Sequence, residues 1–99
     1  MITRVLTWTA LPGKGPEVVG ILKEVAALSG KINGVAPPVI ATTVGGAIGE
    51  VALIAQADSV DAALARVAKN MQNTEMVALL TKLATLVAEN GFDQLYQHA

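Results

Sequence analysis

Four side chains in this sequence could contact a small molecule. Trp8 and Tyr96 each offer an aromatic ring with one hydrogen-bonding group, and Arg4 offers a planar cation that pairs with carboxylates. Thr43 adds a hydroxyl that can donate or accept a hydrogen bond. We predict these four as substrate-binding residues.

Each of these side chains also has an ordinary structural explanation. Trp8 could anchor the core or a dimer interface, and Tyr96 and Thr43 could be sheet residues that face solvent or a partner strand. Arg4 could extend its aliphatic stem over a sheet edge to reach water. If Arg4 stays on an apolar face, it needs a carboxylate or an anionic ligand, and Glu50 is the nearest candidate by topology.

The sequence contains no recognisable catalytic or metal-binding motif. His98 is the only histidine and cysteine is absent, which leaves too few soft ligands for a transition metal. Ser29 and Ser59 fall at expected helix ends rather than in a nucleophile motif. The glycine-rich stretch 45–49 lacks the lysine of a phosphate loop and is better explained as a hairpin turn. We assign no catalytic residue, no cofactor and no metal.

Composition indicates one apolar domain that spans residues 1–99. Apolar residues make up 53% of the chain and charged residues only 15%, against about 25% in typical domains. The net charge is −1 and the basic residues are scattered, so nucleic acid is not an expected partner. No apolar run is long enough to cross a membrane. The lack of cysteine and of a signal-peptide pattern leads us to expect a cytoplasmic location.

The order of apolar segments predicts an α+β domain of the ferredoxin-like order β-α-β-β-α-β, with a four-stranded antiparallel sheet. Strands are expected at 2–11, 39–44, 50–57 and 92–97, and helical stretches at 16–29 and 59–90. Gly30 is expected to end the first helix. Asp58 or Ser59 should cap the second helical stretch, and a new cap at Asn73 or Thr74 should break it.

Both faces of the predicted sheet are apolar. In strand one, Arg4 and Trp8 alternate with threonine and valine, and their face also carries isoleucine and leucine. Strand three is continuously apolar from Val51 to Ala55, as in strands that are covered on both sides. Helices can cover only one face, so we expect a second copy of the chain to cover the other in a homodimer or higher homo-oligomer.

The pattern resembles the dimeric α+β barrel superfamily, which includes antibiotic-biosynthesis-type monooxygenases, NIPSNAP-like proteins and stress-responsive barrel proteins. The resemblance rests on Val5-Leu-Thr-Trp8, Pro-Gly-Lys14, Asp58-Ser-Val-Asp-Ala62, Asn73-Thr-Glu-Met76 and Leu95-Tyr96. It implies that the sheets of two subunits pack face to face as a dimeric α/β barrel, and that a pocket lies between sheet and helices. The catalytic residues of such enzymes do not map onto this sequence.

The sequence is compatible with two functions. The first is a cofactor-free, monooxygenase-like enzyme for a hydrophobic or aromatic small molecule, with Trp8 and Tyr96 framing an apolar pocket. The second is a non-catalytic domain that dimerises and holds a hydrophobic ligand. The lack of a convincing acid–base pair favours the second slightly.

Overall fold

The computed structural model describes residues 1–42, 49–89 and 91–99. These residues form four strands and three helices in the order β1 (Ile2–Thr9), α1 (Gly15–Asn33), β2 (Val39–Thr42), β3 (Glu50–Ala57), α2 (Val60–Met71), α3 (Thr74–Ala84) and β4 (Phe92–Gln97). The predicted end of strand two at 43–44, and most of the glycine-rich turn, lie outside the described residues. No helix among the described residues is long and apolar enough to cross a bilayer.

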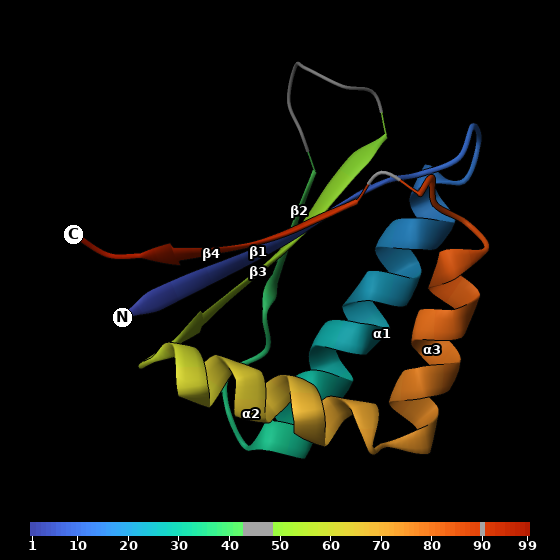
Figure 1. Cartoon of the computed structure of the whole chain (residues 1–99). Coiled ribbons are helices and arrows are strands. Elements are labelled where there is room, and N and C mark those ends of the chain that lie inside the picture. The colour runs from blue at the N-terminus through green and yellow to red at the C-terminus, as the bar shows by residue number, and fades with distance from the viewer. Residues whose placement is uncertain (43–48, 90) are drawn as a thin grey trace.

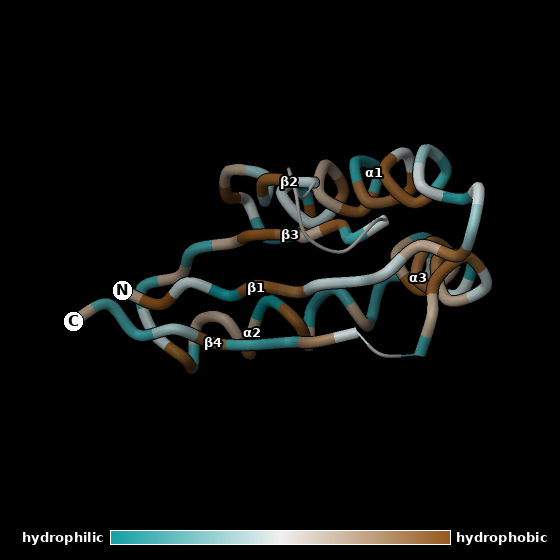
Figure 2. The backbone as a smooth tube through the Cα atoms, turned by 90° about the horizontal axis from the view of Figure 1, so that it is seen from above, coloured by the Kyte–Doolittle hydropathy of each residue, from teal (hydrophilic) through white to brown (hydrophobic). Residues whose placement is uncertain are grey.

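The four strands form one antiparallel sheet in the order β2-β3-β1-β4, which confirms the predicted ferredoxin-like architecture. Figure 1 shows all three helices on one side of this sheet, with α2 running across the ends of α1 and α3. Figure 2 shows the strands side by side, with β2 and β4 at the two edges. The sheet is therefore a single layer with one face covered by helices.

The strand register decides which side chains face the helices. Residues that pair directly lie on the same face, and alternate residues of a strand face opposite ways. Leu6 pairs with Leu53 of β3, and both belong to the core or pack against it. Arg4 and Trp8 share that face with Leu6, as the sequence predicts, whereas Val5 and Thr7 lie on the uncovered face.

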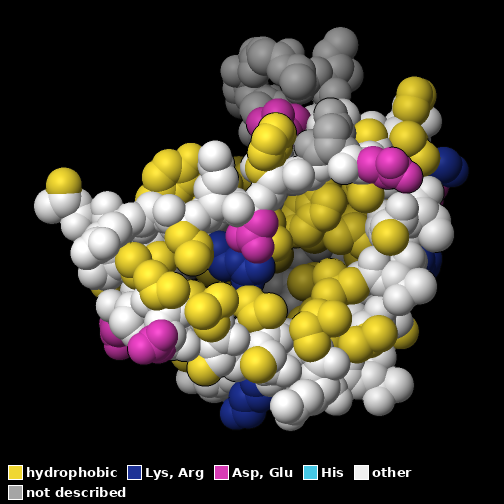
Figure 3. All heavy atoms as spheres, in the orientation of Figure 1, with side chains coloured by type: hydrophobic (Ala, Val, Ile, Leu, Met, Phe, Trp, Pro, Cys, Tyr) yellow, Lys and Arg dark blue, Asp and Glu magenta, His cyan; other side chains and the backbone are white. Residues whose placement is uncertain are grey.

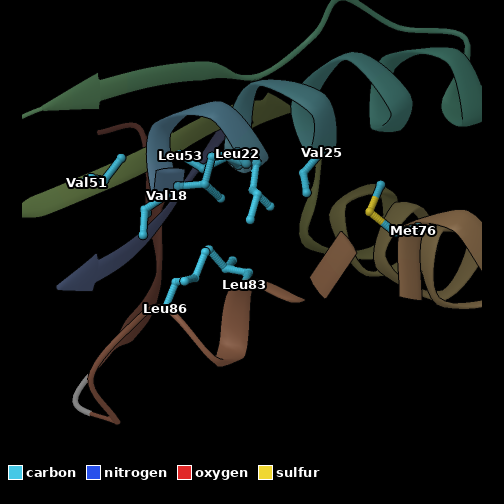
Figure 4. Packing of buried hydrophobic residues seen from close by; sticks show 9 residues of the cluster. Val18, Leu22, Val25, Val51, Leu53, Met76, Leu83 and Leu86 are labelled. Carbon is cyan, nitrogen blue, oxygen red and sulfur yellow. The ribbon is translucent and has the colours of Figure 1, made fainter. Parts of the chain in front are cut away.

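The core lies between the helices and the covered face of the sheet. Leu22 and Val18 of α1 and Met76 of α3 are the largest fully buried side chains. Figure 4 shows Val18 and Leu22 pointing toward Leu83 of α3 and Leu86, with Leu53 of β3 beside Leu22. The three-and-four spacing of apolar residues in α1 produces this packing, because it places one stripe of the helix against the sheet.

The helix starts follow the predicted capping residues. Ser59 Oγ accepts a hydrogen bond from the backbone N–H of Ala62 at 3.1 Å, so Ser59 rather than Asp58 caps α2. Asn73 Oδ1 accepts one from Met76 N–H at 3.0 Å and caps α3. The predicted break near Asn73 is confirmed, and each cap satisfies a backbone donor that the helix leaves unpaired.

Gly30 does not end the first helix. Helix α1 continues to Asn33, and Gly34, with φ of 64°, takes the left-handed cap position. Gly30 is buried instead, and a Cβ there would lie 3.0 Å from the carbonyl oxygen of Val35. Its missing side chain lets the linker fold back against the helix, which is a packing role that the turn signal alone does not distinguish.

The segment after α3 also differs from the prediction. The expected helix to residue 90 ends at Ala84, and Val87 pairs with Ala10 in an isolated bridge. Ala88 N–H donates to the Thr9 carbonyl at 2.8 Å. The backbone at 85–89 therefore hydrogen-bonds to the end of strand one, and this tertiary pairing outweighs a helical preference that the β-branched Thr85 and Val87 already weaken.

Candidate functional site

Two hollows with shared lining residues lie between the covered face of the sheet and the helices. The outer hollow, about 570 Å³, lies between β1, the start of β4, and α3 with the segment after it. The inner hollow, about 140 Å³, lies between β1, β3 and the three helices. Leu6, Trp8 and Leu80 line both hollows. Figure 3 shows a depression lined by hydrophobic side chains on this side of the molecule, with a basic and an acidic side chain beside it.

Trp8 forms the shared wall of the two hollows. It is partly buried against the core and pairs with Val51 of β3. The backbone of Gly91 runs past it, and a Cβ added at Gly91 would lie 3.7 Å from Trp8 Cδ1. The ring thus combines a core contact with a surface that lines the cavity, so the core role considered for Trp8 and a ligand-binding role are compatible.

Arg4 lines the inner hollow and pairs with Asp93 of β4, which lines the outer hollow. Arg4 Nε donates to Asp93 Oδ1 at 3.0 Å and Nη2 donates to Oδ2 at 2.7 Å, a bidentate arrangement. These hydrogen bonds hold the pKa of Asp93 below its ordinary value of 3.8, although partial burial acts in the opposite direction. The carboxylate is therefore ionised at neutral pH.

Glu50, the expected partner of Arg4, does not take this role. Glu50 pairs with Thr9, whereas Arg4 pairs with Ala55, so five residues of strand, roughly 17 Å, separate the two backbone positions. On the other side of β1, Leu95 lies opposite Arg4, and Asp93 lies diagonally across on the same face. Strand four rather than strand three supplies the carboxylate.

A polar cluster lies at the helix side of the inner hollow. Asn70 of α2 and Ser29 of α1 both line the hollow, and Asn70 Nδ2 donates to Ser29 Oγ at 3.1 Å. Asn33 Nδ2 donates to Asn70 Oδ1 at 2.9 Å and to the carbonyl of Ser29 at 2.9 Å. The sequence prediction missed Asn33 and Asn70, because their meeting depends on how the C-terminal ends of α1 and α2 cross.

Tyr96 lies on the other face of the sheet from Trp8. It pairs with Thr3, whose side chain points away from the helices, and its hydroxyl donates to Gln94 Oε1 at 2.6 Å. Tyr96 and Trp8 therefore do not frame one pocket within a single chain. Thr43 lies outside the described residues.

His98 lies near the chain end, where Nε2 is 2.6 Å from Thr3 Oγ1. The histidine lines neither of the two hollows. Among the described residues, no cluster of three or more histidine, aspartate or glutamate side chains could hold a metal ion.

The uncovered face of the sheet carries apolar side chains in all four strands. Val5 of β1 pairs with Ile54 of β3, which in turn pairs with Val39 of β2. The β4 residues Phe92 and Tyr96 lie on the same face. Val39 and Phe92 are 62% and 64% exposed. Threonine and glutamine side chains lie between these residues, so the face is apolar but not uniformly so.

No protein family model and no curated protein sequence matches this chain. Solved structures do match over nearly its whole length. Protein Atu4242 of Agrobacterium tumefaciens is 20% identical with a TM-score of 0.84, and the match covers 100% of this chain and 94% of that one. The NIPSNAP family protein Atu5224 of the same organism is 19% identical with a TM-score of 0.84, over 99% of this chain and 92% of that one.

A third similar structure is a variant of SnoaB, a cofactor-independent oxygenase from Streptomyces nogalater. It is 18% identical with a TM-score of 0.75, over 98% of this chain and 91% of that one. These identities establish similarity of fold. The sequence resemblance to NIPSNAP-like and antibiotic-biosynthesis-monooxygenase-like proteins is confirmed at that level.

Proposed function

We propose that this protein is a homodimeric, cofactor-free monooxygenase-like enzyme that binds a hydrophobic or aromatic small molecule between its sheet and helices. The observation that carries the proposal is the pair of apolar hollows that share Trp8 as a wall. The volume of the outer hollow, about 570 Å³, suits a ligand of one to a few rings, because small-molecule sites have volumes of roughly 300–1,000 Å³ and mostly apolar linings. The similarity in fold to a cofactor-independent oxygenase supports the reaction class.

Apolar and polar groups of the lining would have different roles in binding. Leu6, Leu80 and the Trp8 ring would remove the ligand from water and stack against its rings. The hydrogen-bonded polar side chains of the lining include the Arg4–Asp93 pair and the Asn70–Ser29 cluster. These polar groups would fix the orientation of the ligand, because contacts with the apolar walls are not directional.

An electron-rich substrate can react with O₂ with little chemical assistance from the protein. In the oxidation of a ring methylene to a carbonyl, O₂ supplies one oxygen atom to the carbon and the other leaves as water. The methylene gives up its two hydrogens and four electrons, so no external reductant is needed. The protein would hold the substrate dry, orient it and stabilise its ionised form.

The proposed dimer would cover the apolar face that the helices leave open. Val5, Ile54 and Val39 form a continuous row across three strands of that face, and Phe92 and Tyr96 extend it onto β4. Exposed apolar surface of this kind typically marks an interface. Light scattering tests the assembly: a particle of about twice the 10.2 kDa chain mass is expected, and a monomer at high protein concentration would contradict it.

Trp8 provides the test of function, because it is the only tryptophan and lines both hollows. Titration with 1,8-dihydroxyanthrone should quench Trp8 emission, and an oxygen electrode should record O₂ uptake faster than uncatalysed autoxidation. A Leu80→Phe variant, which narrows both hollows without adding a second tryptophan, should weaken both signals. Absence of quenching with the wild-type protein would refute the proposal.

The alternative is a ligand-binding domain without catalysis. Its supporting observation is that the polar groups of the hollows already pair with each other, as in a site that only orients a ligand. The same titration separates the two functions. Saturable quenching without O₂ uptake would favour the binding domain.

A further inference from the structure

Arg4 is placed to receive an anion from inside the cavity. It lies on the covered face between Ile2 and Leu6, and its direct neighbours across the sheet are Ala55 and Leu95. Its side chain is 23% exposed. Among the residues that line the inner hollow, it is the only charged one. A ligand in that hollow would meet a single formal charge, and that charge is positive.

The guanidinium has donor capacity that Asp93 does not use. Asp93 takes Nε and Nη2, and Nη1 has no hydrogen-bond acceptor among the residues that the structure describes. A guanidinium carries five N–H donors in a fork that matches a planar carboxylate. Arg4 could therefore hold a second carboxylate through Nη1, or exchange Asp93 for it.

The Asp93 carboxylate can be displaced from Arg4 at low cost in free energy. Its side chain is 51% exposed and projects from the edge strand β4, whose residues are all exposed. Water can solvate the carboxylate once it leaves Arg4, so exchange costs less than it would in a buried pair. Asp93 lines the outer hollow and Arg4 the inner one, so the pair is within reach of a ligand in either hollow.

We infer that the ligand of this site is an aromatic or alicyclic carboxylate, whose anionic group binds Arg4 in place of Asp93 while its rings lie against Trp8. This inference rests on the proposed function, since it requires an apolar ligand between sheet and helices. The inference adds that the ligand is negatively charged and that the Asp93 carboxylate competes with it for Arg4.

Calorimetric titration with 2-naphthoate and its neutral amide, 2-naphthamide, tests the inference. The wild-type protein should bind the carboxylate more tightly than the amide. Arg4→Met should weaken binding of naphthoate roughly tenfold or more and leave naphthamide unchanged, because only the carboxylate makes charge-assisted hydrogen bonds. Asp93→Asn should strengthen naphthoate binding by roughly two- to fivefold, because the competing carboxylate is lost.

Glu89→Gln is the matched control. Glu89 also lines the outer hollow, so its loss removes the same charge without a partner of Arg4 being lost. It should change naphthoate affinity less than Asp93→Asn does. If Arg4→Met fails to fold, the comparison of Asp93→Asn with Glu89→Gln still decides the matter.

The outcomes separate this inference from the proposed function. Equal affinity for naphthoate and naphthamide in the wild-type and Asp93→Asn proteins would overturn the inference and leave the apolar site intact. Equal gains from Asp93→Asn and Glu89→Gln would also overturn it, because the effect would then be general electrostatics. Failure of both probes to bind would overturn the inference together with the proposed site.

Discussion

Replacement of Gly91 by alanine should destabilise the protein by a mechanism that can be read from the structure. A Cβ at this position would lie 2.9 Å from the backbone oxygen of Thr7, against the 3.4 Å at which ordinary contacts begin. Thr7 pairs with Phe92, the first residue of β4, so the methyl group would force the start of β4 about half an ångström away from β1. Two backbone segments must move, since no flexible side chain can yield.

The expected magnitude follows from two opposing effects. Overpacking of this kind costs about 1–3 kcal/mol. Loss of glycine's freedom in the unfolded chain returns roughly 0.4–1 kcal/mol. The middle values of these two ranges, about 2 and 0.7 kcal/mol, leave a net loss in the free energy of unfolding of about 1.3 kcal/mol. For a domain of this size that corresponds to a fall in Tm of roughly 5–10 °C.

Gly20→Ala provides the matched control. Gly20 lies in α1, and a Cβ there would meet nothing within 4 Å. The same substitution should stabilise the protein by about 0.5–1 kcal/mol, because alanine favours the helix over glycine. Urea unfolding at one fixed protein concentration, followed by Trp8 emission, measures both variants. A Gly91→Ala protein as stable as the wild type would refute the reasoning.

Three further predictions concern the core, a helix cap and the ion pair. Met76→Ala should lower the free energy of unfolding by about 2–5 kcal/mol, because Met76 is only 1% exposed in the centre of the core; a loss below 1 kcal/mol in urea unfolding would contradict this packing. Asn73→Ala should cost about 1 kcal/mol through loss of the cap on α3, with Thr74→Ala, one residue along, as the milder control in the same unfolding assay. The pKa of Asp93 is lowered by folding, so its pair with Arg4 contributes stability above pH 3.8 that is lost as the pH falls through the lower folded-state pKa. The difference in unfolding free energy between wild type and Asp93→Asn should stay constant from pH 7 to 5, remain under about 1 kcal/mol and shrink below about pH 4; a change centred near pH 6 would exclude this pair as its origin.

Local chemistry was enough to predict most of the architecture. Apolar alternation located the strands, and the side-chain oxygens of Ser59 and Asn73 marked the starts of α2 and α3. Each of these interactions involves residues close together in the sequence, so it does not depend on how distant segments pack. The prediction that Gly30 ends the first helix is wrong, because the sequence does not distinguish a glycine that ends a helix from one that allows a close backbone contact.

The candidate site was predicted only in part, because it depends on register between distant strands. Placing Arg4 and Trp8 on one face needed only the alternation of strand one. Identifying Asp93 as the partner of Arg4 requires the pairing of β1 with β4, whereas the sequence favours Glu50 through the pairing of β1 with β3. The ferredoxin-like strand order points to Asp93, because the last strand neighbours the first and Asp93 is the only acidic residue in the last strand.

The central claim is that the ligand lies between sheet and helices rather than on the uncovered face. An NMR titration with 2-naphthamide tests it most directly, because the chain has one indole N–H, at Trp8, and one phenol ring, at Tyr96. We expect shifts of the Trp8 indole and the Met76 methyl, which lie on the lining of the hollows. Shifts confined to Val39, Ile54 and Tyr96, with Trp8 unmoved, would contradict the claim.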